Sequence, residues 1–121
     1  QGFDFYASDP ITLRHIDIRN RRVPLTEAAV PLSSIRNPSE FDVVFFVGGT
    51  GAMFDFPANP DIQRVVRAIW AKKGIVSAVC HGPIALVNVT LPNGTFLVKN
   101  RHVTGFSTEE ERYLGDANHC R

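Results

Sequence analysis

The chain has 121 residues, of which 44% are hydrophobic and 21% charged, a composition that indicates one soluble globular domain over residues 1–121 and excludes a disordered or fibrous chain. The net charge of +1 indicates no nucleic-acid partner and no anionic membrane surface, and no apolar run reaches the roughly 20 residues of a membrane span. Two cysteines in different settings, Cys80 and Cys120, do not form a disulfide framework. We therefore expect a protein of a reducing compartment, the cytoplasm.

The first 38 residues carry weak signals. Residues 3–7 (FDFYA) are aromatic and are followed by Ser-Asp-Pro, which predicts a short strand that ends in a turn. Residues 11–38 have no sustained hydrophobic period, so we expect an irregular segment with a short strand near residues 14–18.

A strand, a helix and a second strand are predicted over residues 42–79. Residues 43–47 form an unbroken apolar run that ends at a pair of glycines, and residues 75–79 form a second such run. Strands that are apolar on both sides are typical of a parallel sheet covered by helices on both faces. Between them, Asn59 and Pro60 are suited to the N-cap and first turn of a helix, which Lys72, Lys73 and Gly74 would end. One face of that helix is apolar at helical spacing and consists of Ile62, Val65, Val66, Ile69 and Trp70.

The remaining elements are shorter. Residues 83–89 suit a short helix, residues 92–94 a turn, and residues 95–98 and 102–104 a hairpin or strand pair. Residues 108–114 predict a helix that begins with acidic residues. Together these elements predict an α/β fold of the doubly wound, flavodoxin-like kind, with a mainly parallel sheet and helices on both faces.

Cys80 lies where the second strand of this unit ends. The sequence Ala78-Val-Cys-His-Gly82 has the small-x-nucleophile-x-small pattern of a nucleophile elbow, whose tight turn needs small residues on either side. A thiol at the start of the following helix would be favoured as thiolate, the nucleophilic form. The alternative is a buried structural cysteine, because free cysteine is often a small core residue. The elbow spacing favours the reactive thiol.

The neighbours of Cys80 supply further groups. The glycine-rich loop after the first strand includes Gly49, Thr50 and Gly51, whose N–H groups would stabilise an oxyanion. His81 would act as a general acid or base, although a direct pairing with the adjacent thiol is geometrically awkward, so we expect a carboxylate to orient it. One of Glu109, Glu110 and Glu111 is a candidate for that carboxylate. The other histidines have no ligand-like spacing, and no metal site is expected.

Residues 42–86, followed by FLVKNRHVTGFSTEEE, resemble the ThiJ/PfpI superfamily of class I glutamine amidotransferase-like domains. Within it they are most similar to the small heat-shock-type chaperones also described as glyoxalase III enzymes. The resemblance implies that Cys80 is the nucleophile, His81 the adjacent histidine and Glu111 the acid of a triad. It also implies that Gly49 and Gly51 lie by the oxyanion pocket.

The same resemblance implies a function. It suggests conversion of methylglyoxal-like 2-oxoaldehydes to 2-hydroxy acids through the Cys80 thiolate, with no cofactor, together with a stress-chaperone role toward unfolded protein clients and a homodimer. The family usually has histidine at the position of Thr50, and it has a strand before residue 1 and further strands after Glu111. We therefore interpret the chain as a fragment of one such domain.

Two other function classes share these residues. The elbow is also typical of glutamine amidotransferase-like or peptidase-like cysteine hydrolases, although no His-x-Glu pair follows it here. A non-enzymatic chaperone or redox sensor would use Cys80 as an oxidisable thiol. Replacing Cys80 by alanine separates the chaperone from the enzymes, because a chaperone should retain holdase activity and an enzyme should lose turnover completely.

Overall fold

A computed structural model describes residues 29–114. Backbone contacts divide the chain into two units, Gln1–Ser34 and Ile35–Arg121. The first unit contributes the 3-10 helix η2 (Leu32–Ser34) to the described residues, and all elements discussed below belong to the second. The strands expected near residues 3–7 and 14–18 lie outside the described residues.

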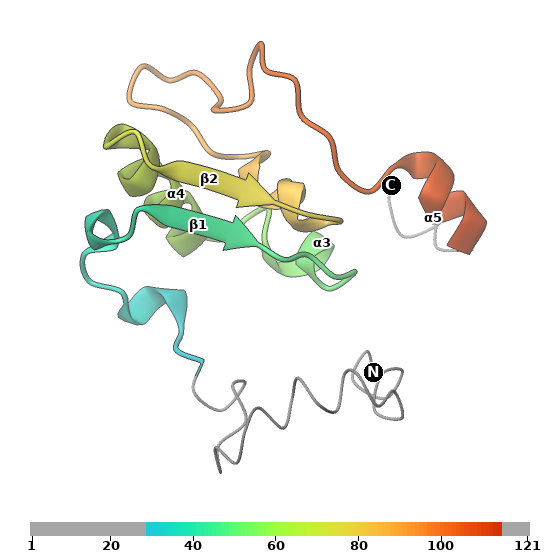
Figure 1. The fold of residues 1–121 in the computed structure, drawn as a ribbon, viewed down its shortest axis with the longest axis horizontal. Helices are drawn as coiled ribbons and strands as arrows, with labels where there is room; N and C mark the ends of the chain where they lie inside the picture. Colours follow the sequence, from blue (N-terminus) through green and yellow to red (C-terminus); the bar gives the residue numbers. More distant parts are fainter. Residues whose placement is uncertain (1–28, 115–121) are drawn as a thin grey trace. The chain divides into compact units, whose positions relative to one another are not determined.

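Within the described residues, two parallel strands pair to form a sheet (Figure 1). Strand β1 (Val43–Phe46) pairs with β2 (Ile75–Ala78), with Val43 opposite Ile75 and Phe46 opposite Ala78. The 3-10 helix η3 (Pro38–Glu40) precedes β1. Because the strands are parallel, the turns that follow them meet at the same edge of the sheet. Both predicted strands and their parallel pairing are confirmed.

Helix α4 (Pro60–Ala71) connects the two strands, as its sequence predicts. The side-chain oxygen of Asn59 accepts hydrogen bonds from the N–H groups of Asp61 and Ile62, which satisfies two of the free donors at the helix start. Four of the five predicted apolar residues are buried: Ile62, Val65, Val66 and Ile69. After α4 the chain turns at Lys73, whose φ is 64°.

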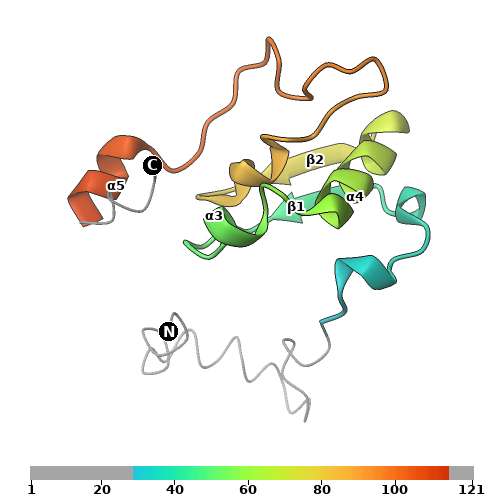
Figure 2. The same ribbon diagram turned by 180° about the vertical axis from the view of Figure 1, so that it is seen from behind.

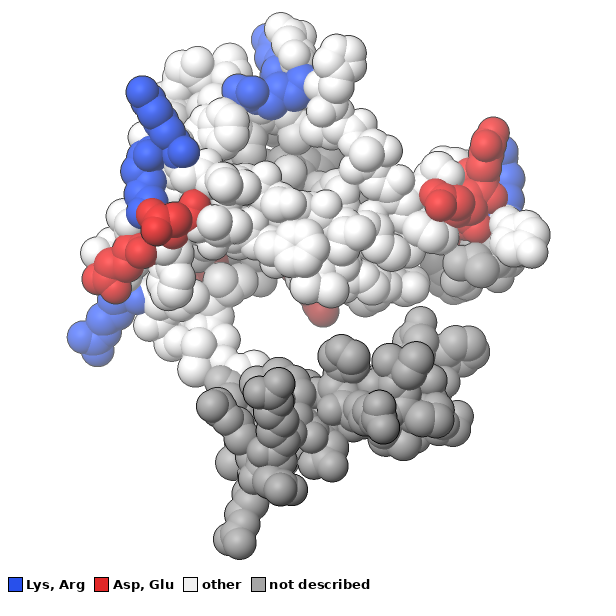
Figure 3. Space-filling model, viewed as in Figure 1, with Lys and Arg blue, Asp and Glu red and all other residues white. Residues whose placement is uncertain are grey.

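The two faces of the sheet differ. Helix α4 and the short helix α3 (Ala52–Asp55) lie on one face, where Phe46 is buried (Figure 2). On the other face Val43, Phe45 and Ile75 are 49%, 54% and 61% exposed. Figure 3 shows this face as a surface of uncharged residues with the lysines, arginines, aspartates and glutamates at its margins. Helices were expected on both faces, and among the described residues they cover one.

The segment after β2 differs from the prediction in part. A 3-10 helix, η4 (Gly82–Leu86), replaces the short helix expected over residues 83–89 and packs against α3 and α4. The predicted turn at residues 92–94 is confirmed by the hydrogen bond from the N–H of Gly94 to the carbonyl of Leu91. Helix α5 (Thr108–Leu114) has the predicted bounds, whereas α3 has no counterpart in the sequence prediction.

The expected strand pair at residues 95–98 and 102–104 is wrong. The described residues in this region form a single bridge, between Thr90 and Phe96. Two turns follow it directly, because the N–H of Lys99 donates to the carbonyl of Phe96 and the N–H of Arg101 to that of Val98. These local bonds use backbone groups that a ladder would need.

Candidate active site

Cys80 lies in the turn directly after β2, at the sheet edge where the elbow pattern predicts it. Its φ is 58°, a left-handed conformation that few residues other than glycine adopt. The turn is closed by the hydrogen bond from the N–H of Gly82 to the carbonyl of Val79. The side chain of Cys80 is exposed, so the alternative of a buried structural cysteine does not hold.

Two glycines make room for this turn. A Cβ atom on Gly82 would lie 2.2 Å from the carbonyl oxygen of Phe46, and one on Gly48 would lie 2.7 Å from that of Val79. Both distances are far below van der Waals contact, so neither position accepts a side chain without a backbone shift. The elbow pattern predicts a small residue at Gly82. The requirement for glycine at position 48 was not predicted from the sequence, although the pair of glycines after β1 was an available signal.

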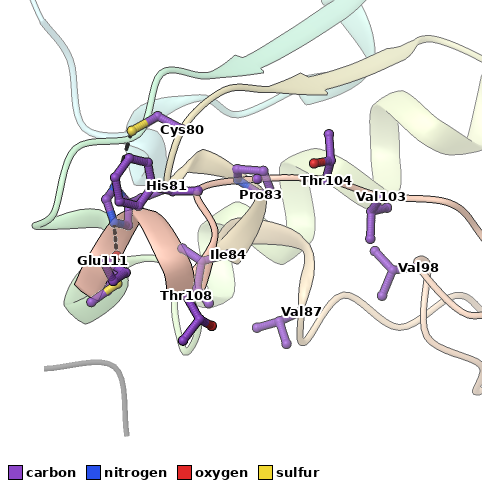
Figure 4. A pocket seen from close by; sticks show the side chains of 13 residues that line it. Cys80, His81, Pro83, Ile84, Val87, Val98, Val103, Thr104, Thr108 and Glu111 are labelled. Atoms are coloured by element: carbon purple, nitrogen blue, oxygen red, sulfur yellow. Dashed lines mark hydrogen bonds and ion pairs between the residues drawn. The ribbon is translucent and has the colours of Figure 1, made fainter. Parts of the chain in front are cut away.

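A continuous chain of contacts joins three of the predicted residues (Figure 4). The Cys80 Sγ atom lies 3.3 Å from His81 Nδ1, and His81 Nε2 lies 2.5 Å from Glu111 Oε1. The expectation that adjacent Cys80 and His81 could pair only awkwardly is therefore wrong. The left-handed backbone at Cys80 bends the chain enough to bring the two neighbouring side chains together.

The pair of His81 and Glu111 is shielded from water. Their side chains are 9% and 5% exposed. Among the three glutamates only Glu111 is buried, since Glu109 and Glu110 are exposed. A buried carboxylate needs a partner, and within residues 29–114 His81 is the partner recorded for Glu111. We assign the Nε2 proton to the bond with Glu111, which leaves Nδ1 facing the thiol.

The segment before α5 holds His81 in place. The ring of Phe106 stacks on the imidazole of His81, with ring centroids 4.5 Å apart. The backbone N–H of Phe106 donates to the carbonyl of Cys80 at 2.8 Å. One residue therefore contacts both the elbow backbone and the histidine. No role was predicted for Phe106 from the sequence, where an aromatic residue between Gly105 and the acidic helix was the available signal.

A capping box begins α5. The N–H of Glu110 donates to the Ser107 hydroxyl, and the N–H of Ser107 donates to the Glu110 carboxylate. The hydrogen bonds from Ser107 lower the pKa of Glu110. Glu110 thus fixes the start of the helix whose next residue, Glu111, contacts His81.

A cavity of about 380 Å³ opens beside these residues. Its lining combines the Cys80, His81 and Glu111 side chains with apolar residues and two threonines, Thr104 and Thr108. Gly49, Thr50 and Gly51 are not part of this lining, and the carbonyl groups of all three accept backbone hydrogen bonds from residues of α3. Their role as oxyanion donors stays a prediction.

Residues 29–114 contain no group of three or more histidine, cysteine, aspartate and glutamate side chains placed to hold a metal ion. None of the helices in this part of the chain is long and apolar enough to cross a membrane.

Known proteins resemble this chain over most of its described part. The model of the DJ-1/PfpI family matches residues 26–118. "Glyoxalase 3" of Candida albicans is 39% identical over 80 residues, which are 65% of this chain and 34% of that protein. "Glutathione-independent glyoxalase hsp3102" of Schizosaccharomyces pombe is 39% identical over 79 residues, or 63% of this chain and 33% of that protein. The chain spans about a third of the length of these curated relatives.

Solved structures agree with this result. The Francisella tularensis Rapid Encystment Protein REP24 is 42% identical with a TM-score of 0.71, over 74% of this chain and 39% of that one. The glyoxalase III of Candida albicans is 36% identical with a TM-score of 0.68, over 72% of this chain and 36% of that one. The predicted flavodoxin-like α/β fold is therefore confirmed.

Proposed function

The chain belongs to the DJ-1/PfpI family, and from this premise we propose that its Cys80 site converts methylglyoxal-like 2-oxoaldehydes to 2-hydroxy acids without glutathione or a bound cofactor. The observation that carries the proposal is the chain of contacts from Cys80 Sγ through His81 to the buried Glu111, at the wall of a cavity. The names of the relatives, which are glyoxalases, supply the substrate class.

The first step is addition of the thiol to the aldehyde. His81 Nδ1, 3.3 Å from the sulfur, takes the thiol proton as the sulfur forms a bond to the aldehyde carbon. Glu111 stabilises the imidazolium that results, because its carboxylate lies against Nε2. The imidazolium then protonates the new alkoxide, which gives a hemithioacetal and restores neutral His81.

The second step is an internal transfer of oxidation state. A base removes the proton from the former aldehyde carbon, the electron pair forms a carbon–carbon double bond and the ketone oxygen takes up a proton, which gives an enediol. Protonation of the neighbouring carbon, with loss of the hydroxyl proton from the former aldehyde carbon, then reduces the ketone to an alcohol while the aldehyde carbon becomes a thioester. His81 is placed for this proton shuttle, since its Nδ1 faces the sulfur to which that carbon is bonded.

Hydrolysis closes the cycle. Water attacks the thioester, the Cys80 sulfur leaves and takes back a proton, and a 2-hydroxy acid is released. Methylglyoxal and one water thus give lactate with no net oxidation, so the balance needs no external oxidant or reductant.

The direct test incubates the 121-residue chain with methylglyoxal in the absence of glutathione and follows the lactate methyl signal by NMR. Lactate should form, and Cys80→Ala should lower the rate by at least about 10⁴-fold, as loss of a triad nucleophile does. Cys120→Ser is the matched control, because it removes the other cysteine of the sequence and should leave the rate unchanged. Lactate formation that survives in Cys80→Ala, or its absence from the unmodified chain, would overturn the proposal.

The homodimer and the unfolded protein clients expected from the sequence stay predictions. The hydrolase alternative shares the elbow and the triad, and it would be supported by amide hydrolysis that depends on Cys80.

A further inference from the structure

The cavity beside Cys80 is much larger than methylglyoxal. Its volume of about 380 Å³ lies in the range of pockets that bind ligands of ordinary drug size. At roughly 30 Å³ per water molecule, it has room on the order of a dozen waters. Methylglyoxal has five non-hydrogen atoms and would leave most of this space to water.

The part of the cavity that methylglyoxal would not fill extends away from the reactive side chains. In Figure 4 the three reactive side chains lie at one end of the cavity, and Val87, Val98 and Val103 lie at the other. Pro83, Ile84 and Thr108 lie between the two ends. We call Val87, Val98 and Val103 the valine end. A substrate bonded through its aldehyde carbon to Cys80 would direct its other substituent along Pro83 and Ile84 toward the valine end.

The lining also sets the charge that a substituent can carry. No lysine or arginine is among the lining residues that the structure describes, and the carboxylate of Glu111 is already engaged by His81. Val87 and Val103 are 44% and 61% exposed, so an anionic substituent would keep part of its water at the valine end, and it would gain no cation in return for the water that it loses. An apolar substituent would instead remove apolar surface of both partners from water.

Resting on the proposed function, we infer that this site is selective for uncharged 2-oxoaldehydes whose substituent is a branched alkyl or aryl group, with the valine end as its specificity determinant. One methylene in an apolar pocket changes kcat/KM by roughly 10- to 200-fold. A substituent three carbons larger than methyl should therefore raise kcat/KM by at least about tenfold.

Three electronically similar probes test this inference. 4-Methyl-2-oxopentanal adds an uncharged branched group to methylglyoxal, and 4,5-dioxopentanoate adds a group of similar size that ends in a carboxylate. We expect kcat/KM to be highest for 4-methyl-2-oxopentanal and lowest for 4,5-dioxopentanoate. Equal values for methylglyoxal and 4-methyl-2-oxopentanal, or the highest value for the anion, would overturn the inference and leave the proposed function intact.

A pair of variants locates the effect. Val87 is 44% exposed at the valine end, and Val43 is 49% exposed on the bare face of the sheet and is not a lining residue. Val87→Asn should lower kcat/KM for 4-methyl-2-oxopentanal at least about fivefold more than it lowers kcat/KM for methylglyoxal, since a polar group replaces apolar contact with the larger substituent. Val43→Asn should change neither. The same loss in both variants would contradict a specificity role for the valine end.

Binding without turnover separates the two proposals. In the Cys80→Ala variant, 5-methylhexane-2,3-dione should bind at least about tenfold more tightly than butane-2,3-dione, as followed by chemical shifts of the valine methyl groups. If no aldehyde is turned over but this preference is found, the proposed function fails and the selectivity of the cavity stands. If the two diketones bind equally, the selectivity fails whatever the turnover.

Discussion

The turns after β1 and β2 lie side by side at one edge of the sheet and solve the same backbone problem with different residues. After β1 the left-handed positions are glycines, Gly48 and Gly49, with φ of 91° and 92°. After β2 the left-handed position is Cys80, with φ of 58°. Glycine adopts this conformation without steric cost, whereas another residue pays about 1–3 kcal/mol. The turn after β2 therefore keeps the reactive side chain of Cys80 in a backbone conformation that favours glycine. Gly48 in the turn after β1 leaves room for it, because this residue carries no Cβ atom.

The largest expected effect is on turnover, because the turn after β2 carries the reactive residues and the turn after β1 does not. Glu111→Gln should lower turnover of methylglyoxal between about 10² and 10⁴-fold, because an amide holds His81 in the wrong tautomer and does not stabilise its charged form. Steady-state kinetics with the lactate assay measure this. Glu110→Gln is the matched control, since this neighbouring carboxylate contacts Ser107 and is not a lining residue of the cavity. Equal losses in the two variants would contradict the role given to Glu111.

The next effect concerns the space that the first turn supplies. Gly48→Ala should lower the free energy of unfolding by at least about 3 kcal/mol, because the new Cβ would overlap the Val79 carbonyl and the Gly82 N–H in addition to the backbone strain. Gly49→Ala has the same positive φ but nothing within 4 Å of its Cβ, so it should cost about 1–2 kcal/mol. Urea denaturation compares the two. Similar losses would mean that the close approach at Gly48 has no energetic consequence.

A smaller effect measures the strain at Cys80 itself. Cys80→Gly should be more stable than Cys80→Ala by about 1 kcal/mol, because glycine accepts the left-handed conformation and alanine does not. Thermal and urea unfolding of the two variants measure the difference. If the alanine variant is equally or more stable, the second turn carries no strain and the contrast with the first turn disappears.

The smallest effect is the pH dependence that comes from the start of α5. The pKa of Glu110 is lowered by its hydrogen bonds from Ser107, so its stabilising contribution is present above the ordinary value near 4.5 and is lost as the pH falls through the lower folded value. At neutral pH, Glu110→Gln should be slightly less stable than the unmodified chain. The difference should vanish below the folded pKa of Glu110. A difference that persists in strong acid would show that the carboxylate charge is not its cause.

Local patterns predicted the parts of the fold that local patterns determine. The cap at Asn59 and the apolar spacing from Ile62 to Ile69 predicted α4, because the residues of one helix face recur every three or four positions along the sequence. The apolar runs predicted β1 and β2, and the small residues around Cys80 predicted the elbow.

Long-range packing decided the rest. Choosing Glu111 among three glutamates required the family resemblance, because the contact that singles it out joins α5 to His81, 30 residues earlier in the chain. The failed strand pair at residues 95–98 and 102–104 has the same origin. Their β propensity is overridden by turns that lead the chain to Phe106, whose N–H binds the elbow.

The central claim is that His81 and Glu111 activate the Cys80 thiol, and the rate of Cys80 alkylation by iodoacetamide tests it most directly. The measurement uses the Cys120→Ser background at neutral pH, so that Cys80 is the one thiol of the chain. Alkylation should slow at least about tenfold in His81→Asn and in Glu111→Gln, with circular dichroism confirming that both variants are folded. Equal alkylation rates in the folded variants and the parent would show that Cys80 reacts as an ordinary exposed thiol and would contradict the account.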